Sequence, residues 1–384
     1  MKRDLLADRL KGYACLLVLF GHVLSGVRTA GVPTPAFFVG VERFLWSFHI
    51  DLFMFLSGYV FRITGGATAK GSRLRFVGSK VIDLGVPYVL FSVLYIAVNA
   101  LTPGVNNAAA LSDTLRIGVA PIAQYWFIYA LFWLFLLWAV LSRFLSYKVI
   151  TTVLYVFFVA CRAFGIDLGF LYATFNCVLA FGIGTCLPTL EPQKLPLFVR
   201  VGSVPLHITV FYLFARLGIT NVLFADDLLT VLGIFAAVCF ISLLQALEPV
   251  AAFLGFVCRY AFPVYLLHTF FTAAVRIVLL LLGVTAYAVH LVAGTAVGLA
   301  GSLAVGWLAA RTPYLNLVFY PTRSLRALCS HFERDRRGER RREEGGRHHG
   351  GKDPDRIHYH SCIQCRKLPG PLRGQCVGTG IYRF

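Results

Sequence analysis

Lys11 and His22, near the start of the chain, are the first pair of residues that could take part in chemistry. They stand eleven residues apart in an apolar segment. On an α-helix this spacing places them on nearly the same face, about 16 Å apart along the axis. A neutral imidazole can accept a proton near neutral pH, as a hydroxyl requires before it attacks a thioester carbonyl. His22 is therefore a candidate general base; the alternative is that it only makes a polar contact between packed helices.

Four further ionisable residues lie within apolar segments, where a charged group is costly and usually faces a cavity or a partner. His49 and Asp51 are two residues apart, on opposite faces of a helix, so Asp51 would orient an imidazole on a neighbouring helix instead. His268 would line a cavity or contact a donor molecule, or else bond a loop carbonyl at the membrane interface. Arg276 lies deeper and needs an anion, either on a substrate or from a carboxylate such as Asp51.

Basic residues crowd one connection between apolar segments, namely Arg62, Lys70, Arg73, Arg75 and Lys80. Arginine binds phosphate through two parallel hydrogen bonds, so this run would suit a cofactor such as coenzyme A. The same charges also fix the topology of most membrane proteins, and that second interpretation is favoured here.

Two other patterns, a Ser-Gly pair in an apolar segment and a group of histidines and cysteines near the carboxyl terminus, are not interpreted as functional sites. Ser57 and Gly58 indicate close helix packing through small residues rather than a nucleophilic serine. The segment 358–365 contains histidines and a single Cys-x-x-Cys, which is a weak signal for zinc, so no metal site is expected.

The hydrophobic composition of the chain predicts which secondary-structure elements carry these residues. The chain is 58% hydrophobic and only 14% charged, with a mean hydropathy of +0.72, whereas soluble domains carry about 25% charged residues. Apolar stretches long enough to span about 30 Å of hydrocarbon recur along it. The prediction is an all-α, polytopic transmembrane helical bundle with about ten spans, at 11–28, 44–63, 81–101, 121–141, 149–165, 168–187, 200–217, 228–247, 262–282 and 287–310.

Charge next to these spans predicts their orientation. The second connection is strongly basic and the first is not, so the amino terminus is expected in the cytoplasm, and an even number of spans returns the carboxyl terminus there. From Arg311 onward the chain has 16 Lys and Arg against 7 Asp and Glu. We therefore expect a membrane domain at 1–315 and a basic, largely disordered cytoplasmic tail at 316–384 that contacts anionic lipids, in a protein of the inner (plasma) membrane.

Four blocks in this order resemble the acyltransferase-3 family of bacterial membrane O-acyltransferases, especially its fucose O-acetylase-like members. They are Leu10-Lys11-Gly12 with Leu19-Phe20-Gly21-His22, the segment from Phe48-His49 to Ser57-Gly58-Tyr59, Tyr125-Trp126-Phe127-Ile128, and Tyr265-Leu266-Leu267-His268. The resemblance covers about residues 5 to 315. It implies that His22 is the essential histidine, that Lys11 is its basic companion, and that acetyl-coenzyme A (acetyl-CoA) is the donor, arriving from the cytoplasm. One departure is Asp83, which stands where the family usually has a basic residue.

The resulting hypothesis is a membrane O-acetyltransferase that acts on a carbohydrate hydroxyl, with no metal and no nucleic-acid partner. His22 and Asp51 are the candidate catalytic residues, and Lys11, Arg73, Arg75 and Lys80 are the candidate donor-binding residues. His49, Trp126, His268 and Arg276 are expected to line the cavity or contact substrate. The main alternative is a transporter or flippase of a glycan or lipid intermediate, in which His22, Asp51, His268 and Arg276 form a polar pathway. A membrane scaffold that acts through the basic tail is a third, weaker interpretation.

Overall fold

The computed structural model describes residues 4–68, 71–102, 105, 109–219, 224–327 and 329. Within these residues every regular element is a helix, which confirms the all-α prediction. Of the tail predicted at 316–384, residue 328 and residues 330–384 lie outside the described residues. The α-helices are α1 (Leu5–Thr29), α2 (Ala36–Trp46), α3 (His49–Ile63), α4 (Arg73–Lys80), α5 (Val86–Leu101), α6 (Trp126–Leu141), α7 (Tyr147–Ala163), α8 (Tyr172–Asn176), α9 (Val178–Cys186), α10 (Leu197–Leu217), α11 (Ala225–Leu244), α12 (Glu248–Arg259), α13 (Ala261–Leu281), α14 (Tyr287–Arg311) and α15 (Pro313–Phe319).

The chain divides into two compact units, Met1–Thr322 and Arg323–Phe384. All the helices named above belong to the first unit, which therefore continues through α15, slightly past the predicted boundary at residue 315. The backbone N–H of Thr322 donates to the Asp83 carboxylate at 3.1 Å. This hydrogen bond gives a structural role to the acidic residue that departs from the family pattern.

Eight helical segments among the described residues are long and apolar enough to cross a membrane. They are Leu5–Thr29, Ala36–Ile63, Arg73–Leu101, Ala123–Leu141, Leu197–Leu217, Ala225–Leu244, Ala261–Leu281 and Tyr287–Arg311. A ninth is added if the bent pair Gly169–Asn176 and Val178–Cys186 forms one span. The multi-pass helical bundle is thus confirmed, with a smaller number of spans than the ten predicted.

Two predicted spans account for the difference. The segment at 149–165 forms α7, whose 17 residues are at the short end of the range of about 17–25 that crosses the hydrocarbon core. The segment at 168–187 is broken into a short 3-10 turn, α8 and α9, with a bend of 40°. Apolar composition extends through both segments, but it does not reveal where a helix ends or bends. The orientation of the two termini stays a prediction: that of the amino terminus rests on loop charge, and that of the carboxyl terminus depended also on an even number of spans.

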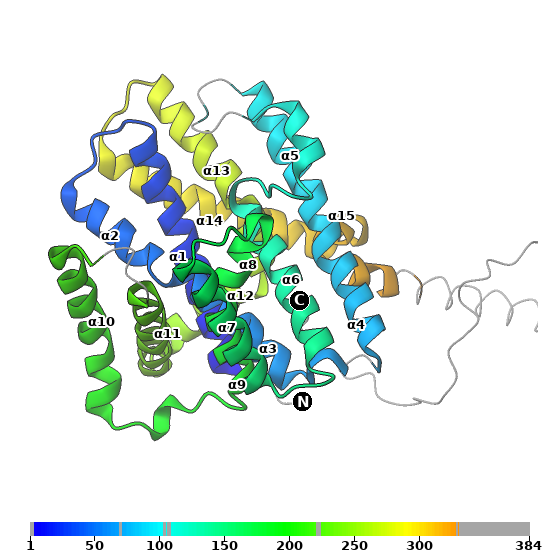
Figure 1. Cartoon of the computed structure of the whole chain (residues 1–384). Helices are drawn as coiled ribbons and strands as arrows, with labels where there is room; N and C mark the ends of the chain where they lie inside the picture. Colours follow the sequence, from blue (N-terminus) through cyan, green and yellow to red (C-terminus); the bar gives the residue numbers. More distant parts are fainter. Residues whose placement is uncertain are drawn as a thin grey trace, which may run out of the picture. The chain divides into compact units, whose positions relative to one another are not determined.

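Helix α1 packs against α2, α3, α11, α12, α13 and α14 (Figure 1). It begins where the Asp4 carboxylate accepts the backbone N–H groups of Leu6 and Ala7 at 3.0 Å, as an N-cap residue does. The other oxygen of Asp4 accepts the hydroxyl of Tyr59 at 2.5 Å. Because Tyr59 lies near the end of α3, the start of α1 and the end of α3 lie at the same end of the bundle.

Interruptions in three long apolar segments shape the region around α1. Ser47 and Phe48 separate α2 from α3, so the predicted span at 44–63 contains a break. A π-helical turn at Val81–Gly85 joins α4 to α5 just before Pro87, which has no backbone N–H to continue an α-helical pattern. A 3-10 turn at Ala123–Tyr125 precedes α6.

The outer surface of the bundle remains apolar. Helix α10 packs mainly on α11, and Leu206, Ile208 and Leu213 on its other faces are about half exposed, at 51%, 49% and 48%. An exposed helix face of this composition is suited to contact with lipid acyl chains.

Candidate active site

Three histidines from three different helices lie together in the bundle. His22 comes from α1, His49 from the start of α3 and His268 from α13. The ring centroids of His22 and His268 are 5.0 Å apart. Trp46 packs edge-on against the rings of His22 and His49, with centroid distances of 5.5 Å and 4.8 Å. The structure thus brings together three of the histidines that the sequence singled out.

Hydrogen bonds orient two of these imidazoles. The Nδ1 atom of His49 lies 2.6 Å from the Leu45 carbonyl, and Nδ1 of His268 lies 2.9 Å from the carbonyls of Val264 and Tyr265. A carbonyl only accepts, so Nδ1 carries the proton in both rings and Nε2 keeps a lone pair. Both Nε2 atoms are buried without a hydrogen-bond partner among the described residues. His268 is 1% exposed and bonds its own helix, so the alternative of an interfacial histidine bonded to a loop does not apply.

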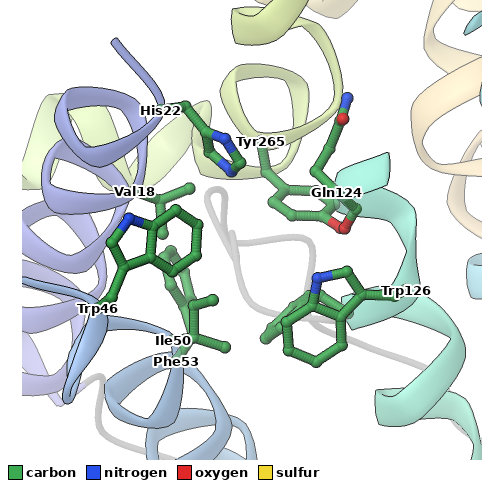
Figure 2. Close-up of a pocket in the computed structure, with 9 residues that line it drawn as sticks. Val18, His22, Trp46, Ile50, Phe53, Gln124, Trp126 and Tyr265 are labelled. Carbon is green, nitrogen blue, oxygen red and sulfur yellow. The ribbon is translucent and has the colours of Figure 1, made fainter. Parts of the chain in front are cut away.

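Two cavities meet at His22. The smaller has a volume of about 30 Å³ and is lined mainly by apolar side chains, including Val18, Ile50, Phe53 and Phe127. Figure 2 shows His22 and Tyr265 at one side of it, with Trp46 and Trp126 facing each other across the space. Val18 lies one turn before His22 on α1, so this narrow cavity extends from His22 toward the end of the bundle that holds Asp4 and Tyr59.

The larger cavity, which we call the polar chamber, has a volume of about 360 Å³. Its walls include Ser25, Thr29, Asn99, Thr272 and Arg276. Since Ser25 and Thr29 follow His22 along α1, the chamber extends from His22 toward the opposite end of the bundle from the narrow cavity. The side chains that line both cavities are those of His22, Trp46, Gln124 and Trp126.

The 3-10 turn before α6 is fixed to α13 by side-chain hydrogen bonds. The Tyr265 hydroxyl donates to the Gln124 carbonyl, the Tyr125 hydroxyl donates to the Leu266 carbonyl at 3.0 Å, and Gln124 Nε2 donates to Thr269 Oγ1 at 2.7 Å. Ala123 in the same turn has a φ of +45°, a left-handed conformation that is unusual for alanine. These contacts position Gln124 and Trp126 opposite the histidines, and strained backbone of this kind is common at functional sites.

Asp51 lies apart from the histidines. Its Oδ2 atom accepts the Thr230 hydroxyl of α11 at 3.2 Å, and it is not among the residues that line the two cavities. The prediction that His49 and Asp51 point to opposite faces of their helix therefore holds. As a consequence, the carboxylate faces α11 while His49 Nε2 points toward α1, where a Cβ atom at Gly21 would lie 3.7 Å from it.

The candidate donor-binding residues lie in different environments. Arg73 donates from Nη1 to the Ala139 carbonyl at 2.9 Å and to Ser142 Oγ at 2.7 Å, and from Nη2 to the Ser142 carbonyl at 3.0 Å. It therefore caps the end of α6. Lys80 is 5% exposed, with its Nζ 4.0 Å from the ring centroid of Phe135. Arg75 is exposed on α4, and Lys11 is half-buried on α1.

Replacing Arg73 by alanine is expected to lower the thermal stability of the protein, because three hydrogen bonds at the end of α6 are lost. A hydrogen bond from a charged group contributes about 1.5–3 kcal/mol. Arg75→Ala, on an exposed side of the same helix, is the matched control and should leave Tm almost unchanged. Thermal unfolding in detergent micelles checks this prediction; equal Tm values for the two variants would contradict the capping role.

A third cavity lies at the end of the bundle that holds Asp4 and Tyr59. It has a volume of about 360 Å³, is open to the outside, and is lined by residues that include Arg62, Ser146, Tyr147 and Lys148. We call it the basic cavity. The Arg62 guanidinium carbon lies 5.1 Å from the ring centroid of Tyr147. Arg62 belongs to the basic run that the sequence singled out, whereas Lys148 follows a later apolar segment and carried no signal of its own.

Sequence reasoning also missed Trp46, Tyr95, Asn99 and Gln124. All four line the polar chamber. Gln124 is directly followed by the block Tyr125-Trp126-Phe127-Ile128, so its place beside that motif was the one signal that could have identified it.

Comparison with known proteins identifies the family of this chain. A family model described as an acyltransferase domain, that of the acyltransferase-3 family, matches residues 7–311. A nodulation protein NolL of Mesorhizobium japonicum is 33% identical over 144 residues, 37% of this chain and 37% of that protein. A second nodulation protein NolL, of Sinorhizobium fredii, is 30% identical over 149 residues, 38% of this chain and 36% of that protein. The chain therefore matches little more than a third of the length of these relatives, and no solved structure matches it.

The family match begins two residues into α1 and ends with the last residue of α14. It thus includes the three histidines, the aromatic block after Gln124 and all of the eight long apolar segments except the first two residues of α1. The chain belongs to the acyltransferase-3 family of membrane O-acyltransferases.

Proposed function

We propose that this protein transfers an acetyl group from acetyl-CoA to a hydroxyl of a carbohydrate, with His22 as the general base. The observation that carries the proposal is the place of His22, between a narrow apolar cavity on one side and the polar chamber on the other. The small acetyl thioester group at the tip of the donor suits the first, and a polyhydroxylated acceptor suits the second. The two substrates would then meet at the imidazole.

The donor is proposed to enter from the basic end of the bundle. Arg62 lies thirteen residues after His49 on α3, which is about 20 Å along the helix axis. Phosphates bound by Arg62 and Lys148 in the basic cavity would leave the long arm of coenzyme A to extend along α3 toward His22, past Lys11 on the neighbouring helix. Loop charge predicts that this end faces the cytoplasm, where acetyl-CoA is available.

The acceptor is proposed to occupy the polar chamber. Trp46, Tyr95 and Trp126 provide aromatic surface, and Ser25, Asn99 and Thr269 provide hydroxyl and amide groups. Aromatic rings combined with a few convergent polar groups are characteristic of small-molecule sites and suit the apolar and hydroxylated faces of a sugar.

In the proposed reaction, His22 removes the proton from the acceptor hydroxyl as its oxygen attacks the thioester carbonyl carbon. The carbon–oxygen bond forms, the carbon–sulfur bond breaks, and the imidazolium returns the proton to the departing thiolate. His268 Nε2, which has no described partner, lies next to this step and can accept a hydrogen bond from the acceptor or from water. The proposal assigns no direct role to Asp51, which would act only on the packing of α3 against α11.

The experiment that tests this function uses acetyl-CoA labelled in the acetyl group, purified protein in lipid membranes, and a pool of glycan acceptors. Release of free coenzyme A together with a base-labile acetyl ester on a glycan is the expected result. Absence of both, with no affinity for coenzyme A, would reject the proposal. Passage of unmodified glycan across the membrane in that case would instead identify the transporter alternative.

Replacing both Arg62 and Lys148 by glutamine is expected to raise the KM for acetyl-CoA by about 10-fold or more, because two charged hydrogen-bond donors to phosphate are lost. The kcat at saturating donor should change little, since both residues lie far from His22. Initial rates at a series of acetyl-CoA concentrations check this prediction. An unchanged KM would exclude the basic cavity as the site of the donor phosphates.

A further inference from the structure

Arg276 is the one cationic side chain among the described residues that line the polar chamber, and none of those residues is acidic. It is 9% exposed, and it lies on α13 eight residues after His268, about 12 Å along the axis. Its Nε atom has no hydrogen-bond partner among the described residues. The chamber therefore contains a buried, permanently charged group with hydrogen-bonding capacity left over.

The usual partners of a buried arginine do not account for this one. The carboxylate of Asp51, which the sequence offered as a partner, faces Thr230 of α11 instead. By contrast, Arg73 directs its donors to two carbonyls and a hydroxyl at the end of α6. An isolated charge in a bundle core is costly, and such a group usually faces an ion or substrate of opposite charge.

The guanidinium lies close to the catalytic histidine. A Cβ atom at Gly26 would lie 2.6 Å from Arg276 Nη1, so the guanidinium rests directly on α1 at that position. Gly26 is four residues after His22, one helical turn or about 6 Å along the axis on the same face. An anion held by Arg276 would thus be separated from the reacting hydroxyl by roughly the width of one sugar ring.

We propose that the acceptor is an acidic sugar unit whose oxyanion, a carboxylate or a phosphate ester, binds Arg276 while its hydroxyl is presented to His22. This inference rests on the proposed function, because it assumes that the polar chamber holds the acceptor. A planar guanidinium binds either oxyanion through two parallel hydrogen bonds. The charge of the acceptor would then select the substrate and fix which of its hydroxyls reaches the imidazole.

The test measures binding of three probes to the protein in lipid nanodiscs without donor: methyl glucoside, methyl glucuronoside and glucose 1-phosphate. Intrinsic fluorescence can report binding because Trp46 and Trp126 line the chamber. One of the two anionic sugars is expected to bind about 10- to 100-fold more tightly than the neutral one, the gain that a charged hydrogen bond gives. Which of the two binds more tightly distinguishes a carboxylate from a phosphate.

Arg276→Met should remove this preference, whereas Arg276→Lys should retain part of it. Gly26→Ala displaces the guanidinium without removing its charge, so it should weaken the preference for anionic sugars. This variant tests the proposal if Arg276→Met does not fold. Arg28→Met is the matched control, because Arg28 lies near the end of the same α1 helix but is paired with Glu42 at 2.8 Å. It should bind all three probes as the wild type does.

Equal affinity for neutral and anionic sugars, no binding of any anionic probe, or a preference unchanged by every Arg276 and Gly26 variant would overturn the proposal. Release of coenzyme A from acetyl-CoA is measured on the same samples. Release without an anion preference would reject the acidic acceptor and leave the acetyltransferase function standing. An anion preference without release would reject that function instead.

Discussion

Replacing His22 by alanine or glutamine is expected to lower the rate of acetyl transfer by about 10²- to 10⁴-fold, the contribution of a positioned general base. Four described side chains line both the narrow cavity and the polar chamber. Of these, His22 alone has a side chain that can act as a base, because those of Trp46, Trp126 and Gln124 cannot accept a proton. Release of free coenzyme A by equal amounts of wild-type and variant protein in membranes measures the effect.

A matched control separates loss of chemistry from loss of structure. His207 on α10 is also a buried histidine, 2% exposed, but it packs against the rings of Phe44 and Phe48 and is not among the residues that line the two cavities. His207→Leu should therefore keep most of the transfer activity. A His22→Gln protein that inserts normally and transfers acetyl groups at the wild-type rate would reject His22 as the base.

Substituting Gly58 by valine is expected to prevent stable folding of the bundle. A Cβ atom at Gly58 would lie 2.0 Å from the carbonyl oxygen of Phe181, and one at Gly184 would lie 2.1 Å from the carbonyl oxygen of Phe55. The backbone of each of the helices α3 and α9 thus approaches a glycine of the other, which confirms close helix packing at Gly58. Overpacking in a well-packed core costs typically 1–3 kcal/mol, and more where backbone must move. Since α3 carries His49, the site would be lost with the fold.

Thermal unfolding in detergent and the yield of monodisperse protein measure this effect, which should appear already in Gly58→Ala. The control is Gly255→Ala on α12, where no atom lies within 4 Å of the added Cβ atom. Removing a glycine from a helix interior contributes about 0.5–1 kcal/mol of stability, so this variant should be as stable as the wild type or slightly more. A Gly58→Ala protein with the same Tm as Gly255→Ala would contradict direct backbone contact between α3 and α9.

Several features of the site could be predicted because they depend on one helix at a time. Apolar composition and the order of four short blocks were sufficient for the membrane class and the family, and they singled out His22, which lines both cavities at the meeting point of α1 and α13. Helical geometry was sufficient to place His49 and Asp51 on opposite faces, because the angle between residues two apart is the same in any α-helix. The number of spans was less accurate, since composition does not record the bend between α8 and α9 or the short length of α7.

The environments of the basic residues could not be predicted from their charge. Arg62, Arg73 and Lys80 look alike in the sequence, yet Arg62 lines an open cavity, Arg73 caps α6 and Lys80 packs on the ring of Phe135. Each outcome depends on what another helix presents at that point. The sequence shows how many cationic residues a segment has, but it does not show which carbonyl groups and aromatic rings from other helices they contact.

Composition and local spacing are properties of the chain, and they were enough to establish the helical membrane fold, the family and the residue types available for acyl transfer. Which of those residues meet depends on how the helices pack. This packing brought His268 and His49 to His22 and turned Asp51 toward α11. It also left the Nε atom of Arg276 without a described partner in the wall of a polar chamber. The physical reason is that the helical repeat fixes the direction of each side chain within its own helix, while packing between helices fixes what that side chain faces.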